Sequence, residues 1–159
     1  MGAEDQQERL NAQWIAGFVD GEGCFYIGIN RMPKMKIGWQ VLPEFRVVQH
    51  KRDIEILHRI KEKLGCGRVK RNHGDRFEVR VRGVEELKKV ISFFQKHSLQ
   101  TTKRKNFETF SKVIAMMEKK AHLTKEGLDK IAKMASTMNE KVKPAYLVSS
   151  ETLRQTSKR

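Results

Sequence analysis

The chain has 159 residues, with 33 lysines and arginines against 19 acidic residues and a formal net charge of +14. Its length fits one domain with a real core, and its charge indicates a polyanionic partner, nucleic acid rather than a membrane because no long apolar run is present. Cys24 and Cys66 lack the spacing of a zinc site and fit a reducing compartment. The acidic N-terminus, residues 1–10, argues against a targeting peptide.

The first predicted element is a helix from about Asp5 to Val19. Near its end, Gly17 and Gly21 lie four residues apart, so on a helix they share one face, with Ala16 beside them. A glycine within a helix costs about 1 kcal/mol relative to alanine. Two glycines so close together indicate that a neighbour, most simply a second helix, approaches the backbone at this face.

The helix leads into an acidic, glycine-rich end within the nine residues 15–23, which read IAGFVDGEG. Gly21 and Gly23 suit a helix C-terminus, where a residue in the left-handed conformation is favoured. Such an end would hold Glu22 in a fixed position beside a close contact between helices.

Further along the chain, alternating and helical patterns predict four strands and four helices. The strands are Cys24–Asn30, Trp39–Val48, Arg68–Asn72 and Arg76–Arg82, and the helices are Asp53–Leu64, Val84–Lys96, Arg104–Lys120 and Lys125–Met138. This order predicts an α+β fold. The segment from Glu140 is basic and weakly patterned, so we expect a single domain over residues 1–139 and a tail over residues 140–159.

The two predicted hairpins alternate apolar and polar residues, as expected for a sheet that packs with one face and reads a nucleic-acid groove with the other. The predicted base-reading residues are Tyr26, Asn30, Gln40, Arg46, Arg68, Lys70, Asn72, Arg76 and Arg80. Glu44 and Glu78 would either accept a hydrogen bond from cytosine or orient a neighbouring arginine. A merely solvated face with ion pairs would carry balanced charge, whereas the polar face of the second hairpin has about five cations to one anion.

Residues 15–23 resemble the LAGLIDADG motif of homing endonucleases, with four of the motif's letters identical and the others conservatively replaced. The resemblance implies an αββαββα fold with a curved four-stranded antiparallel sheet, here with additional C-terminal helices. The motif occurs once, which implies a homodimer, because members with two motifs are monomers. The residues predicted at the dimer interface are Ala16, Gly17, Asp20 and Gly21.

The resemblance also assigns catalytic roles. It makes Glu22 a metal ligand, helped by the carbonyl of Gly21. Two copies of Glu22 brought together would repel unless a cation joined them, and oxygen ligands suit Mg²⁺, with Mn²⁺ as a substitute and Ca²⁺ supporting binding without cleavage. Gln49 and Lys103 are placed around the attacking water, with Arg104 and Lys105 as alternatives to Lys103.

The predicted function is therefore that of an intron-encoded homing endonuclease. As a homodimer it would make a double-strand break in a long, near-palindromic DNA site by metal-dependent phosphodiester hydrolysis. The alternatives are a maturase that binds intron RNA and a DNA-binding protein that does not cleave; the presence of Glu22 favours cleavage. The expected location is a prokaryotic cytoplasm or an organelle matrix or stroma.

Overall fold

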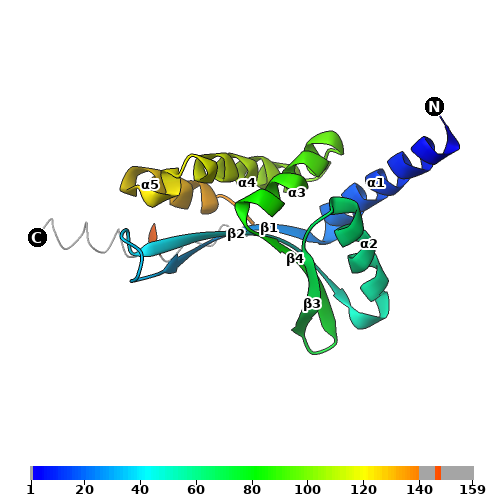
Figure 1. The fold of residues 1–159 in the computed structure, drawn as a ribbon, viewed down its shortest axis with the longest axis horizontal. Coiled ribbons are helices and arrows are strands. Elements are labelled where there is room, and N and C mark those ends of the chain that lie inside the picture. Colours follow the sequence, from blue (N-terminus) through cyan, green and yellow to red (C-terminus); the bar gives the residue numbers. More distant parts are fainter. Residues whose placement is uncertain (1, 140–145, 148–159) are drawn as a thin grey trace, which may run out of the picture. The chain divides into compact units, whose positions relative to one another are not determined.

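The computed structural model describes residues 2–139 and 146–147, and its elements follow the predicted order (Figure 1). The helices are α1 (Ala3–Glu22), α2 (Ile54–Leu64), α3 (Val84–Lys96), α4 (Lys103–Glu118) and α5 (Lys125–Ala135), with short 3-10 helices η1 (Lys51–Asp53) and η2 (Ala121–Leu123). The strands are β1 (Gly23–Arg31), β2 (Trp39–His50), β3 (Arg68–His73) and β4 (Arg76–Arg82), forming one antiparallel sheet in the order β1-β2-β4-β3. The predicted α+β fold is confirmed.

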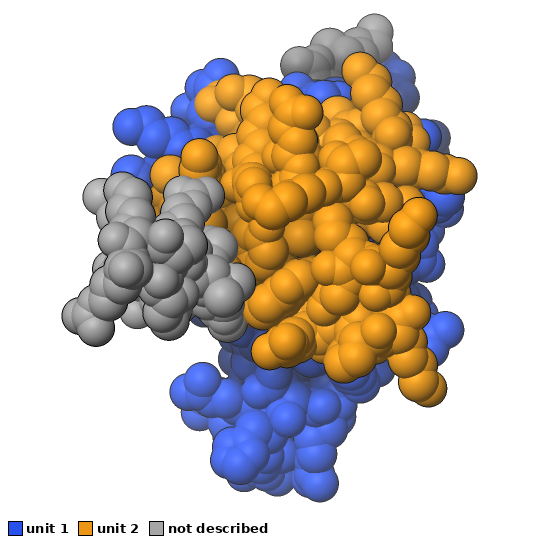
Figure 2. Space-filling view, turned by 90° about the vertical axis from the view of Figure 1, so that its left-hand side faces the viewer, with its two compact units in different colours: residues 1–25, 44–107 blue, residues 26–43, 108–159 orange. Residues whose placement is uncertain are grey.

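The chain divides into two compact units (Figure 2). Unit 1 comprises residues 1–25 and 44–107, and unit 2 comprises residues 26–43 and 108–159. The expected boundary between a domain over residues 1–139 and a tail over residues 140–159 stays a prediction, because residues 140–145 and 148–159 lie outside the described part of the chain. No helix among the described residues is long and apolar enough to cross a membrane.

Helix α1 is longer than predicted and ends differently. It continues through Gly21 to Glu22, and Gly23 follows in an extended conformation with φ −79°. The expected left-handed glycine at the helix end is therefore wrong. A Cβ atom at position 23 would lie 2.6 Å from Val19 Cγ1 and 2.9 Å from the Val19 carbonyl oxygen, so glycine is needed there for space.

The core of unit 1 contains a cluster of phenylalanine rings. Phe25 lies 5.1 Å from Phe45, 5.8 Å from Phe94 and 5.4 Å from Phe107 between ring centroids, in tilted and edge-on arrangements that aromatic rings favour. Three of these rings stand three or four residues from Glu22, Gln49 and Lys103 in the sequence. The cluster therefore anchors the three segments that carry the predicted catalytic residues.

Helices α2 and α3 cover the apolar face of the β3–β4 hairpin in unit 1. Each presents a buried stripe at helical spacing: Leu57, Ile60 and Leu64 on α2, and Leu87, Val90 and Phe94 on α3. Val79 and Val81 of β4 are fully buried beneath them. Since alternate residues of a strand point to opposite faces, this packing turns the basic row of the hairpin away from the core.

Unit 2 is built from the tip of the β1–β2 hairpin, most of α4, and α5. Helix α5 begins at a Thr124 cap, whose side chain accepts a hydrogen bond from the Gly127 backbone N–H at 3.1 Å. In this part of β1, Ile27 and Ile29 are buried and Tyr26 and Asn30 are exposed, as predicted, whereas Gly28 is buried and departs from the alternation.

Candidate active site and nucleic-acid interface

The structure brings Glu22 and Gln49 together. Glu22 is the exposed last residue of α1, and Gln49 lies near the end of β2; the Gln49 side-chain Nε2 donates a hydrogen bond to Glu22 Oε2 at 3.3 Å. One copy of the chain thus brings together two residues that were predicted separately, one as a metal ligand and the other beside the attacking water.

The end of α1 favours a cation. The last turn of α1 carries Asp20 and Glu22 and contains no basic residue. A helix C-terminus has partial negative charge, and its last carbonyls lack partners within the helix. The Gly21 carbonyl is one of these, so carboxylate and carbonyl oxygens meet at an electronegative position, a donor set of the kind that hard divalent cations take.

Asp20 holds the segment that precedes α4. Its carboxylate accepts hydrogen bonds from the backbone N–H groups of Gln100 and Thr101 at 2.8 and 3.1 Å, and from the Thr101 hydroxyl at 2.8 Å. Burial opposes the charged form of Asp20, but these hydrogen bonds and the charge of Lys103 outweigh it and lower the pKa of the carboxyl group. Asp20 is therefore engaged within its own chain.

Lys103, the first residue of α4, directly follows this anchored segment. Its backbone N–H donates to the Thr101 hydroxyl at 3.3 Å, and its charge acts on Asp20, two residues before Glu22. Lys103 is half-buried, whereas Arg104 and Lys105 are exposed. These contacts connect Lys103 to the end of α1.

Replacing Asp20 by asparagine should lower the free energy of unfolding by about 1–3 kcal/mol, because an amide places a donor against one of the N–H groups that the carboxylate accepts. The difference would be measured by urea denaturation at pH 7 and fixed protein concentration. The matched control is Asp53→Asn, whose side chain is 59% exposed and pairs only loosely with Arg52 at 3.8 Å. It should change stability by less than about 0.5 kcal/mol. Equal effects of the two substitutions would contradict an anchoring role for Asp20.

One face of α1 is open. Gly17 and Gly21 are exposed, and a Cβ atom at either would meet none of the described residues within 4 Å. Trp14, 50% exposed, stacks on Phe18 with 5.2 Å between ring centroids. Ala16, which was expected at a dimer interface, is only 5% exposed and lies on the face of α1 that packs inside the chain. The open face thus consists of the two glycines and the Trp14–Phe18 stack.

The predicted base-reading residues differ in accessibility. In unit 2, Tyr26 and Asn30 are exposed and Gln40 is half-buried. In unit 1, the basic and amide side chains are exposed or half-buried, while both acids of the row are buried: Arg68, Lys70, Asn72 and Arg76 are exposed, Arg46 and Arg80 are half-buried, and Glu44 and Glu78 are 4% and 0% exposed.

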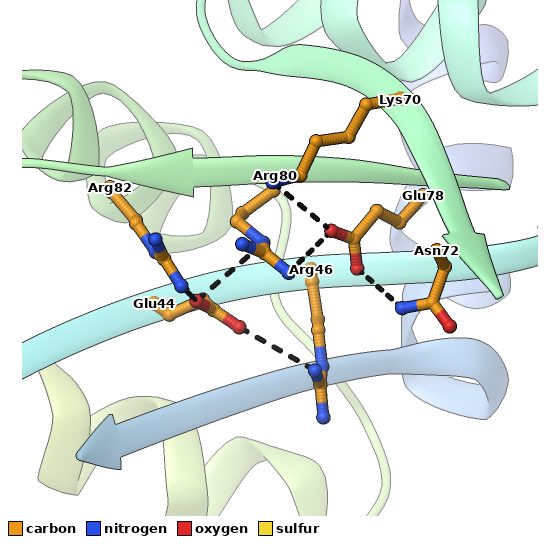
Figure 3. Close-up of polar contacts among 7 residues, drawn as sticks. All are labelled: Glu44, Arg46, Lys70, Asn72, Glu78, Arg80 and Arg82. Carbon is orange, nitrogen blue, oxygen red and sulfur yellow. Dashed lines mark hydrogen bonds and ion pairs between the residues drawn. The ribbon is translucent and has the colours of Figure 1, made fainter.

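The two buried acids are the centres of a polar network (Figure 3). Glu44 Oε2 accepts from Arg82 Nε at 2.7 Å, and Glu78 Oε2 accepts from the Asn72 amide at 2.8 Å. Arg80 lies between them, with Nη2 2.6 Å from Glu78 Oε1 and Nε 3.6 Å from Glu44 Oε2. Arg82 is absent from the predicted reading residues, although it continues the same alternating row and could have been found by that spacing.

Comparisons with known proteins agree with this geometry. A family model described as LAGLIDADG endonuclease matches residues 15–114. The probable intron-encoded endonuclease 3 of Neurospora crassa is 32% identical over 134 residues, covering 82% of this chain and 25% of that protein. The DNA endonuclease I-CeuI of Chlamydomonas moewusii is 27% identical over 123 residues, covering 72% of this chain and 56% of that protein. The chain spans about a quarter of the length of the first curated relatives it matches.

Solved structures are similar as well. The crystal structure of the homing endonuclease I-TnaI matches with a TM-score of 0.78 at 55% identity, covering 80% of this chain and 87% of that one. The LAGLIDADG homing endonuclease I-LtrWI, bound to its target DNA, matches with a TM-score of 0.79 at 39% identity, covering 82% of this chain and 44% of that one.

Proposed function

We propose, because this chain belongs to the LAGLIDADG endonuclease family, that it is a site-specific DNA homing endonuclease. It would act as a homodimer and make a double-strand break in a long, near-palindromic DNA site. The observation that carries the proposal is the position of Glu22 at the end of α1, hydrogen-bonded to Gln49 at 3.3 Å and next to the glycines of an open helix face. We infer that this chain supplies one half of a catalytic centre.

The homodimer is inferred from that open face. Gly17 and Gly21 leave room for the backbone of another helix, and a second copy would place its own Glu22 nearby. A dimer with twofold symmetry would read a near-palindromic site with one sheet per half-site.

Glu22 and the Gly21 carbonyl would hold a divalent metal, for which we propose Mg²⁺ because both donors are oxygens. Among the described residues no group of three or more His, Cys, Asp and Glu side chains could hold a metal ion, so further ligands would come from the second copy, water and DNA. When bound, such a metal would help to ionise water and offset the charge of the phosphate.

Gln49 would position the reacting groups, and Lys103 would stabilise charge on the phosphate. Gln49, hydrogen-bonded to the Glu22 carboxylate, would keep that group in orientation and offer its amide to the attacking water. Lys103, placed by the segment that Asp20 anchors, would stabilise negative charge that develops on the phosphate.

The DNA partner is supported by the net charge of +14 and by the basic row of the β3–β4 hairpin. A maturase that binds intron RNA, or a DNA-binding protein that does not cleave, is the alternative function. The intact acid at position 22 favours cleavage over both. Relatives named as intron-encoded support an intron origin, and we propose an organelle matrix or a prokaryotic cytoplasm as the location.

Selection from a randomised DNA library tests the proposal. With Mg²⁺ the protein should enrich a long, near-palindromic site as cleaved molecules, and with Ca²⁺ it should enrich the same site as bound, uncut molecules. Binding without cleavage in either metal would favour the DNA-binding alternative. Enrichment of neither, with tight binding to a structured intron RNA, would favour the maturase.

A further inference from the structure

The two acids in the basic row of the sheet are inaccessible. Glu44 is 4% exposed and Glu78 is 0% exposed, although they alternate with the basic residues that face away from the core. A carboxylate covered by its neighbours cannot reach the N4 amino group of a cytosine in a DNA groove. The first of the two predicted roles, direct base reading, is therefore not available to either residue without rearrangement.

Strand register explains how the acids become covered. In the pairing of β2 with β4, Glu44 stands opposite Arg82 and Arg46 stands opposite Arg80. In the pairing of β3 with β4, Glu78 stands opposite Lys70. Each acid thus faces a cation across a strand pair, and long basic side chains close over it. An irregularity in β3 between Arg71 and His73 adds the Asn72 amide to Glu78.

The contacts divide the arginines into two kinds. Arg80 is 20% exposed and joins both acids, so its guanidinium is held inside the network. Arg82 and Arg46 have side chains 46% and 39% exposed and are held from one side, Arg82 at 2.7 Å and Arg46 at 3.6 Å from oxygens of Glu44. More than a third of each of these two side chains therefore remains accessible although each contacts Glu44.

The network keeps a net positive charge. Four cations, Arg46, Lys70, Arg80 and Arg82, surround two carboxylates (Figure 3). Three of them, with Arg68 and Glu86, also line a hollow on unit 1. A held guanidinium beside such a hollow can offer two parallel N–H donors to a guanine or a phosphate, a geometry that lysine cannot provide.

We propose that Glu44 and Glu78 are positioning residues that hold this network in place, and that Arg82 and Arg46 are the side chains through which it determines DNA specificity. In this arrangement Arg80 supports the network and does not read a base. The inference rests on the proposed DNA-binding function. It adds Arg82 to the predicted base-reading residues and removes Glu44, Glu78 and Arg80 from them.

Glu44→Gln is the main test, using the full-length protein and the site selected by wild type in Ca²⁺. It should reduce discrimination between that site and a scrambled duplex about tenfold, because loosened arginines no longer make a two-bond contact. Affinity for the scrambled duplex should stay equal or rise, because one negative charge is lost. The matched control is Glu85→Gln, which removes the same charge at a side chain that is 89% exposed, and it should leave discrimination unchanged.

Arg82→Lys is a second variant. It keeps the positive charge at position 82 and leaves the Glu44 carboxylate unchanged. It should lower discrimination about tenfold, because lysine lacks the planar fork. The proposal is overturned if folded Glu44→Gln, checked by circular dichroism, discriminates as well as wild type. It is also overturned if Arg82→Lys leaves discrimination unchanged. Failure of wild type to select any DNA would instead refute the proposed function.

Discussion

Replacing Glu22 by glutamine should abolish DNA cleavage while leaving specific DNA binding nearly unchanged. The amide has the same shape and can still meet the Gln49 side chain, which now donates to Glu22 at 3.3 Å. It carries no charge, however, and is a poor ligand for a hard divalent cation. Because a metal supplies several kcal/mol of transition-state stabilisation, the rate of strand cleavage should fall by about 10³-fold or more.

The measurement is single-turnover cleavage of the selected site in Mg²⁺, with binding measured separately in Ca²⁺. Glu22→Asp should retain cleavage, since aspartate keeps the same type of ligand. Glu55→Gln, an exposed acid on α2, controls for the loss of a single negative charge. Cleavage by Glu22→Gln at the wild-type rate would show that the acid at the end of α1 is not a metal ligand.

Much of the fold follows from periodicity that the sequence displays. Alternation around Phe25 and Ile27 predicts a half-buried strand, and the spacing of Leu57, Ile60 and Leu64 predicts one face of a helix; all five are buried. The end of α1 was not predictable in this way. The glycine at position 23 is required by the closeness of Val19, and sequence spacing alone cannot separate that reason from a left-handed conformation.

The candidate site was predicted less completely, for a physical reason. Alternation indicates which face a residue takes but not what covers it, so the burial of Glu44 and Glu78 depends on side chains from three strands. The hydrogen bonds from Gln100 and Thr101 to Asp20 link residues about 80 positions apart, with no periodic signal between them. Contacts between side chains that only the tertiary fold brings together could not be predicted from the sequence pattern.

Replacing Gly17 by leucine should convert the proposed dimer into a folded monomer. Among the described residues the first added atom finds open space, since a Cβ at position 17 has no neighbour within 4 Å. Leucine is also a better helix former than glycine, by about 0.8 kcal/mol, so the monomer should be at least as stable as before. Against a second α1 helix, by contrast, the side chain would occupy the space that the partner's backbone needs.

Sedimentation velocity at micromolar concentration would show the change in mass, and thermal unfolding would show that the fold is intact. Lys61→Leu, at an exposed position of α2, controls for an added surface leucine and should leave the dimer in place. Gly23→Leu should behave differently from both and destabilise the fold, because its Cβ would lie 2.6 Å from Val19 Cγ1 and 2.9 Å from the Val19 carbonyl oxygen. A Gly17→Leu protein that sediments as a dimer would place the interface elsewhere. If it is a monomer, it should also lose double-strand cleavage with Glu22 still present, because one copy supplies only half of the proposed catalytic centre.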